Sequence, residues 1–249
     1  MKKILIRGLI ILGVFSLWEG LIHLLNLPVY ILPSPIKIAL FIVNNISKLL
    51  YHLSFTLMEA VAGFMLALAI GFIIAIIFVY NKDMEKSLYP FAVALKVTPL
   101  LALAPILILW FGTGHISKII AATTLCFFPI LVNSIKGLHS VDRNALDLFK
   151  SLGATKKLIF LKLRIPHSLP YVFQGLKIST SLAIEGAIVA EFLGATKGIG
   201  YLIVVSSYHL NTVQTFAAII LSAIAGIVFF QVISFIEKKI VFWHSKQEI

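Results

Sequence analysis

The stretch LMEAVAGFMLALAIGFIIAIIFVY, from Leu57 to Tyr80, is apolar along almost its whole length. A helix needs about 20 apolar residues to cross the hydrocarbon core of a bilayer, and this stretch is long enough. Lone strands cannot satisfy their backbone groups in lipid, and the sequence lacks the short alternating segments of a β-barrel. The stretch therefore predicts a membrane-spanning helix.

Five further runs of similar character predict an all-α membrane protein with six transmembrane helices. They are Ile4 to Leu25, Pro90 to Phe111, Ile116 to Leu138, Tyr171 to Gly194 and Phe216 to Ile236. The composition agrees, because 60% of the residues are hydrophobic and 12% are charged, whereas soluble domains have about 25% charged residues. The first run could also be a cleaved signal peptide, but no small-x-small cleavage site precedes Pro28. Residues 36–50 have apolar residues at helical spacing and are expected to lie along the membrane surface.

Basic residues predict the orientation of these spans. With the N-terminus in the cytoplasm, most of the 21 Lys and Arg residues fall on the cytoplasmic side. The exceptions are Lys96 within a span and four residues outside, which are Lys37, Lys48, Lys118 and Lys197. Because cytoplasmic loops carry an excess of Lys and Arg, we expect both termini to be cytoplasmic.

The largest cytoplasmic loop has an apolar pattern as well as a basic one. Four apolar residues fall on one face of a short helix that Asp142 could cap and Gly153 would end: Ala145, Leu148, Phe149 and Leu152. A second short helix is expected from Thr155 to Ile165, stopped by Pro166, with Pro170 in the first turn of the fifth span. A helix too short to span but with an exposed apolar face predicts a docking element for a soluble partner.

This loop resembles the EAA loop of the permease subunits of bacterial ABC importers. That motif is E-A-A, three residues, G, nine residues and I-x-L-P. Here DLFKSLG, residues 147–153, is followed by nine residues and then by LRIP, residues 163–166. Asp147 replaces the glutamate, and Leu148 and Phe149 replace the alanines. The resemblance implies an ATPase-coupling loop formed by Asp147, Leu148, Phe149, Lys150, Ser151, Leu152, Gly153, Ala154 and Pro166.

Five segments, in this order along the chain, are similar to the branch that handles nitrate, sulfonates, taurine and thiamine or flavin precursors. They are ILPSP (31–35), ALAPILILWFGTGHISKII (102–120), FFPILVNSIKGL (127–138), SLGAT (151–155) and AEFLGATKGIGYLI (190–203). The resemblance implies the type I importer permease fold in the bacterial plasma (inner) membrane. It also implies the partners: two ABC ATPase subunits, a second permease that is expected to be an identical copy, an extracytoplasmic solute-binding protein and membrane lipid.

Alternating access is the mechanism that the resemblance implies, with no cofactor bound by this chain and with ATP and Mg²⁺ held by the partner ATPase. The sequence itself has no nucleotide-binding G-x-x-x-x-G-K-[ST] loop, no paired-histidine metal motif and one cysteine, Cys126. These features argue against an enzyme, and topology already explains the basic residues without nucleic acid. The alternative function is an ion-coupled secondary transporter.

Ionisable residues and prolines inside the spans are candidates for the translocation path, because charges at mid-bilayer are costly. The candidates are Lys96, Pro99, Pro105, Glu185 and Glu191. Glu185 could instead form a hydrogen bond between helices, and Lys96 could extend to the cytoplasmic interface. Pro99 and Pro105 are expected to bend the third span.

The expected organisation has three parts. Residues 1–53 form the first span and the interfacial segment, and residues 54–236 form a five-span permease core with the coupling loop at 139–170. Residues 237–249 form a cytoplasmic tail. Small residues four apart, such as Gly63 and Ala67, predict close helix packing, either within one subunit or at a dimer contact.

Overall fold

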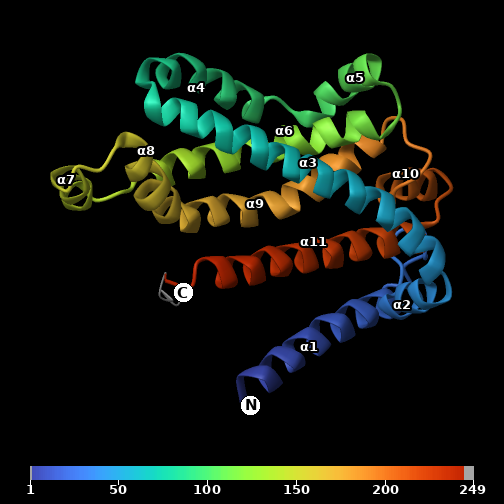
Figure 1. Ribbon diagram of the computed structural model, residues 1–249. Helices are drawn as coiled ribbons and strands as arrows, with labels where there is room; N and C mark the ends of the chain where they lie inside the picture. Colours follow the sequence, from blue (N-terminus) through green and yellow to red (C-terminus); the bar gives the residue numbers. More distant parts are fainter. Residues whose placement is uncertain (1, 244–249) are drawn as a thin grey trace.

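The computed structural model describes the backbone of residues 2–243, together with the side chains of residue 10 and residues 12–243. Within this part the chain is helical and contains no strand (Figure 1). The helices are α1 (Lys2–Leu24), α2 (Pro35–Asn44), α3 (Ile46–Tyr80), α4 (Lys82–Val97), α5 (Leu100–Phe111), α6 (His115–His139), α7 (Arg143–Ser151), α8 (Lys156–Ile159), the π-helical turn η1 (Phe160–Arg164), α9 (Ile165–Glu191), α10 (Ile199–Tyr208) and α11 (Thr212–Ile240).

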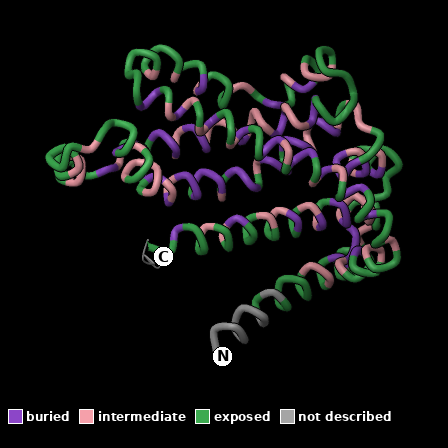
Figure 2. The backbone as a smooth tube through the Cα atoms, viewed as in Figure 1, coloured by how far each residue is buried: buried purple, intermediate pink, exposed green. Residues whose placement is uncertain are grey.

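Helices α3, α6 and α9 form the centre of the bundle, and their facing sides are buried (Figure 2). Small residues allow the close approach. A Cβ on Gly63 of α3 would lie 2.6 Å from the Ala122 Cβ on α6, and one on Gly186 of α9 would lie 2.7 Å from the Ala122 Cα. The backbones therefore approach closely at α6, as expected where lipid supplies no hydrophobic drive between helices. These small residues serve packing within one chain.

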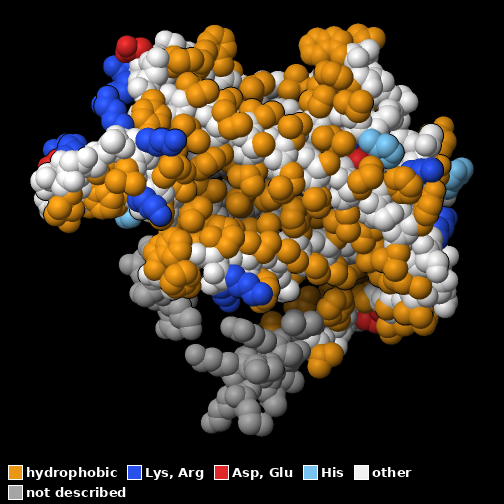
Figure 3. Space-filling view, in the orientation of Figure 1, with side chains coloured by type: hydrophobic (Ala, Val, Ile, Leu, Met, Phe, Trp, Pro, Cys, Tyr) orange, Lys and Arg blue, Asp and Glu red, His pale blue; other side chains and the backbone are white. Residues whose placement is uncertain are grey.

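Within the described residues, four helices are long and apolar enough to cross a membrane. They are α3, α6, α11 and the continuous helix Lys156–Glu191. The pair α4 and α5 makes a fifth if it is counted as one broken span. Apolar side chains cover the face of the bundle in Figure 3, as they must on a surface that meets lipid. The first predicted span, Ile4 to Leu25, corresponds to α1 (Lys2–Leu24).

The prediction of one helix from Pro90 to Phe111 is wrong. Helix α4 already begins at Lys82 and runs through Pro90, and α5 follows it at an angle of 99°. The break lies at Thr98, which is extended (ψ 124°), and at Pro99, which precedes the first residue of α5. A proline disfavours helical geometry at the residue before it, which agrees with the extended Thr98, and the expected bend at Pro99 is confirmed. Pro105 lies inside α5 and does not end it.

The prediction that Pro166 stops a helix begun at Thr155 is also wrong. The helix continues from Lys156 through α8, η1 and α9 as far as Glu191. In η1 the Ile165 N–H donates to the Phe160 carbonyl five residues back, and the next residue, Pro166, has no N–H to place. The π-turn thus lets the helix continue past a residue that cannot donate a backbone hydrogen bond. Pro170 lies inside α9 rather than at its start.

The N-terminal segment packs against the end of the bundle opposite α7 (Figure 1). The expected helix at residues 36–50 is divided at Asn45 into α2 and the start of α3, so the expected boundary after residue 53 falls inside α3. The Thr212 hydroxyl donates to the Val29 carbonyl (2.6 Å), and the rings of Trp18 and Phe216 lie 6.1 Å apart. These contacts join the end of α1 to the start of α11, while the rest of α1 diverges from the bundle (Figure 1).

Candidate functional site

Helix α7 lies in the predicted coupling loop and ends as the sequence predicts. Gly153 has φ +72°, its N–H donates to the Lys150 carbonyl, and the Ala154 N–H donates to the Phe149 carbonyl. This pair of bonds is a Schellman motif, which requires a left-handed residue that glycine supplies at little cost. Asp142 precedes α7 as expected, but its side chain makes no capping hydrogen bond.

Helix α7 protrudes from one end of the bundle (Figure 1), and its apolar face is largely uncovered. Leu148 is 58% exposed and Leu152 is 76% exposed, whereas Ala145 and Phe149 are half-buried. At the rim of this face the Lys150 ammonium lies 2.9 Å from the Asp147 carboxylate. The structure therefore leaves most of the surface of these two leucines uncovered.

The remaining residues of the predicted loop connect α7 to α9. The Ser151 hydroxyl donates to the Leu148 carbonyl within α7, and Ala154 is half-buried after the glycine turn. Pro166 lies in the first turn of α9. Together these residues form a short, hydrogen-bonded connection between the protruding helix and a long helix of the bundle.

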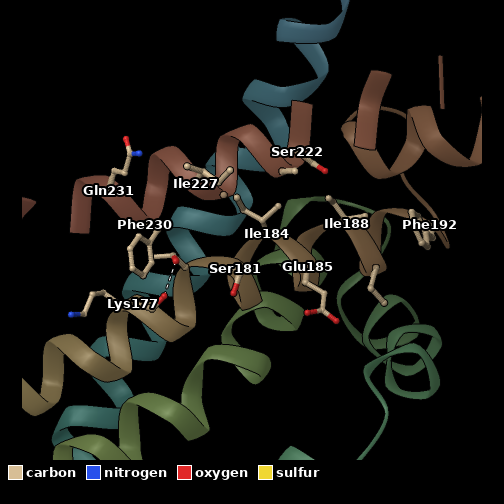
Figure 4. Close-up of a pocket in the computed structure, with 14 residues that line it drawn as sticks. Lys177, Ser181, Ile184, Glu185, Ile188, Phe192, Ser222, Ile227, Phe230 and Gln231 are labelled. Carbon is tan, nitrogen blue, oxygen red and sulfur yellow. Dashed lines mark hydrogen bonds between the residues drawn. The ribbon is translucent and has the colours of Figure 1, made fainter. Parts of the chain in front are cut away.

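A groove of about 940 Å³ runs between α9 and α11 (Figure 4). Its α9 wall includes Ser181, Glu185 and Phe192, and its α11 wall includes Ser222, Phe230 and Gln231. Ser181 and Glu185 are four residues apart and extend from the same flank of α9, as Figure 4 shows. Glu185 is exposed, so a carboxylate in the last two turns of α9 faces this groove.

Glu191 is on the same helix as Glu185 but is buried elsewhere, with 1% of its surface exposed. Its Oε1 accepts a hydrogen bond from the Thr56 hydroxyl (2.7 Å), and its Oε2 accepts one from the Gly200 N–H (2.5 Å). The structure therefore separates the two predicted path acids. Glu191 joins α3, α9 and the start of α10, and Glu185 lines the groove.

Thr56 and a further side chain of α3, His52, complete this contact with α10. The Ile199 N–H donates to the Thr56 hydroxyl (2.8 Å), and the Gly198 N–H donates to His52 Nδ1 (3.2 Å). The first N–H groups of a helix have no partner within it, and the helix dipole favours negative charge there. We call His52, Thr56 and Glu191 the α10 clasp, because they satisfy three such groups from two spans.

The position of Glu191 in the α10 clasp explains why residues 198 and 200 are glycines. Gly198 has φ +109°, and a Cβ there would collide with the Glu191 carboxylate. A Cβ on Gly200 would lie 2.7 Å from the Glu191 Cβ. Only glycine leaves room for the buried carboxylate at both positions.

Lys96, the remaining charged candidate, contacts neither acid. Its ammonium lies 4.8 Å from the centre of the Phe128 ring, in a cation–π contact between α4 and α6. The side chain is exposed and does not line the groove between α9 and α11. Pro99 and Pro105 are likewise exposed outside that groove.

Comparison with known proteins identifies the family. Residues 67–242 match the family described as the inner membrane component of binding-protein-dependent transport systems. The chain belongs to this family. It is therefore a permease, a membrane transport subunit of an ATP-driven importer rather than an enzyme. Family membership favours this function over an ion-coupled secondary transporter.

Individual relatives support the assignment over nearly the full length. The formylaminopyrimidine transport permease protein ThiX of Halalkalibacterium halodurans is 36% identical over 96% of this chain and 96% of its own. A putative aliphatic sulfonates transport permease protein, SsuC of Bacillus subtilis, is 30% identical over 100% of this chain and 89% of its own.

The fold agrees with a solved structure. A chain of the MetNI methionine ABC transporter in inward-facing conformations has a TM-score of 0.61 to this permease. It is 17% identical, over 81% of this chain and 96% of that one. The permease therefore has the type I importer fold expected from the resemblance of its sequence.

Sequence analysis missed most of the polar groups buried at the end of this permease opposite α7. Besides the clasp, Glu59 Oε1 lies 2.7 Å from His115 Nδ1, and the buried Lys118 ammonium donates to the carbonyls of Thr113 and Gly114. A signal existed, because His52, Thr56 and Glu59 recur at helical spacing along one face of an otherwise apolar helix. Lys118 carried no such signal, since its partners are backbone carbonyls.

Proposed function

We propose that a separate ATPase subunit binds the apolar face of α7 and that its movements drive transport through this permease. The observation that carries the proposal is the exposure of Leu148 and Leu152 on a helix that protrudes from the bundle. In the assembly that we propose, two copies of the permease pair in the membrane and each binds one ATPase subunit. An extracytoplasmic binding protein delivers the solute.

Burial of the two leucines supports docking. Covering a leucine side chain fully contributes about 1.5–3 kcal/mol, so an ATPase cleft that covers both gains several kcal/mol. Helix α7, which contains Leu148 and is capped by Leu152, lies at an end of the molecule, where a soluble subunit can reach it (Figure 1). Asp147 and Lys150 are exposed beside them and supply polar contacts at the rim of the interface.

Continuity of the helix from Lys156 to Glu191 supports transmission of the movement. A displacement of α7 reaches α8 through the short turn at Gly153, and α8 continues into α9 without a break. Helix α9 forms one wall of the groove that contains Glu185. A ligand shifts a conformational equilibrium only by its differential affinity for the two conformations. ATP bound to the ATPase can therefore shift the conformation of the translocation path only if a stiff connection links the two subunits.

Charge supports an orientation in which α7 is cytoplasmic. Most of the Lys and Arg side chains visible in Figure 3 lie toward the end that carries α7. Helix α4 begins at that end with Lys82, and α8 begins there with Lys156. By the positive-inside rule this end faces the cytoplasm, and so do both termini.

The solute is a small molecule of one of two kinds. ThiX and SsuC are named for a formylaminopyrimidine and for aliphatic sulfonates, so an amino-heteroaromatic precursor and a sulfonate-like anion are both candidates for this permease. We place its path at the groove between α9 and α11, which a second permease would close.

The substitution Leu148→Asp tests the proposal. It puts a charge on the docking face but leaves every membrane-spanning helix intact, so the permease is expected to insert normally while ATP-dependent uptake falls at least about tenfold. Leu148→Met is the matched control, because it keeps the face apolar and should retain uptake. Uptake into membrane vesicles and the amount of copurified ATPase are the measurements. Full uptake by Leu148→Asp at normal expression would refute the assignment of α7.

A further inference from the structure

The groove between α9 and α11 contains one carboxylate that no neighbouring cation balances. Two of its lining residues are charged, Lys177 and Glu185. The Lys177 ammonium lies 2.9 Å from Glu237 Oε2, so the lysine charge is already paired across the two helices. Among the described residues Glu185 forms no ion pair. The groove therefore has a net negative charge.

The apolar surroundings of Glu185 strengthen the electrostatic interactions of its carboxylate. Ile184, Ile188 and Phe230 line the same groove, and apolar walls lower the local dielectric constant below that of water. An anion that approaches the carboxylate there is repelled more strongly than in water. A ligand that donates an N–H to the carboxylate gains a charge-assisted hydrogen bond instead.

The other lining groups suit a flat, polar-edged ring. Phe192 and Phe230 offer aromatic surfaces, while Ser181, Ser222 and Gln231 offer hydrogen-bonding groups. The volume of about 940 Å³ is at the upper end of the range for pockets that hold drug-sized ligands. Size alone therefore excludes neither a sulfonate nor a heteroaromatic ring, and charge is the discriminating property.

We infer that Glu185 determines specificity in the translocation path, favouring neutral or cationic heteroaromatic amines over sulfonate, nitrate and similar anions. This inference rests on the proposed function, because it takes the groove to be part of the path. The charge of this one side chain would then distinguish an amino-heteroaromatic solute from a sulfonate-like anion. An exocyclic amino group would donate to the Glu185 carboxylate while the ring packs against Phe230 or Phe192.

Binding to the permease–ATPase complex in lipid nanodiscs tests this inference without the binding protein, whose own selectivity would otherwise dominate. The probes are radiolabelled 4-amino-2-methylpyrimidine and ethanesulfonate, a neutral amine and an anion. The unmodified complex is expected to bind the pyrimidine at least about tenfold more tightly, the difference that one charge-assisted contact provides. Glu185→Gln should reduce this preference about tenfold, and Glu185→Lys should reverse it toward ethanesulfonate.

Asp83→Asn is the matched control, because it removes the same charge from α4, outside the groove, and should leave the preference unchanged. Equal binding of both probes, a preference for ethanesulfonate, or a preference unaltered by Glu185→Gln would overturn the inference, as would the binding of neither probe. None of these outcomes alters copurification of the ATPase or the effect of Leu148→Asp. The two proposals can thus fail separately.

Discussion

Glu191 is a predicted path residue for which the structure gives a different environment. Both of its carboxylate oxygens accept hydrogen bonds, from Thr56 and from the Gly200 N–H, and the side chain is almost fully buried. Buried polar groups in lipid-facing proteins have no water to bind, so such partners are essential. The position of Glu191 in the sequence made it a candidate for the translocation path, and only the structure shows that it binds α10.

The substitution Glu191→Gln should lower the free energy of unfolding by about 2 kcal/mol, the amount associated with a hydrogen bond to a charged group. An amide has one acceptor oxygen, so its NH₂ group would face either the Gly200 N–H or the Thr56 hydroxyl. Denaturant unfolding of the permease in detergent measures the change. Glu185→Gln is the control and should alter stability by less than about 0.5 kcal/mol, because Glu185 is exposed. Equal midpoints for the two variants would contradict the clasp.

At the scale of the element, the end of α7 depends on one backbone conformation. Gly153 has φ +72° and no atom within 4 Å of the place where a Cβ would lie, so only backbone geometry restricts this position. Gly153→Asn should retain most uptake because asparagine tolerates left-handed geometry, whereas Gly153→Pro should abolish it because proline fixes φ near −65°. ATP-dependent uptake normalised to membrane-inserted protein is the measurement. Uptake by Gly153→Pro equal to that of the unmodified permease would show that the shape of this turn is irrelevant to coupling.

Helices were predictable from sequence where one signal dominated. The apolar runs gave α3, α6 and α11, and the spacing of apolar residues with a terminal glycine gave α7 and its end. Prediction failed at Pro166, which was expected to stop a helix. A π-turn carries the chain past this residue, and such a turn depends on packing that no local pattern reveals. The bend expected at Pro99 is present, but its angle of 99° and the division into two helices were not predicted.

Helix α10 was not predicted at all. Its ten residues follow a glycine-rich turn and are too few to span a membrane, so length and composition gave no signal for them. What fixes α10 is the clasp, which joins its first N–H groups to side chains more than a hundred residues earlier in the chain. Contacts between distant parts of the sequence are the information that a single sequence lacks.

At the scale of the whole molecule, the distribution of charge predicts the topology of the permease. Both termini and α7 should face the cytoplasm, while the loop between α5 and α6 should face outward. A fluorescent protein that folds only in the cytoplasm should therefore fluoresce when fused after residue 249, and alkaline phosphatase should be active when inserted at Gly112. The reverse pattern would show that α7 faces the outside of the cell, where no ATPase subunit could bind it.

The most direct measurement is crosslinking from α7 itself. Cys126 is the one cysteine and is buried, so Cys126→Ala together with Leu148→Cys places a single thiol on the exposed face of α7. In native membranes that contain the partner ATPase, a thiol-directed crosslinker should join residue 148 to the ATPase subunit, and Leu109→Cys on α5 should yield no such product. Products that contain only lipid or permease, in membranes with active transport, would contradict the account.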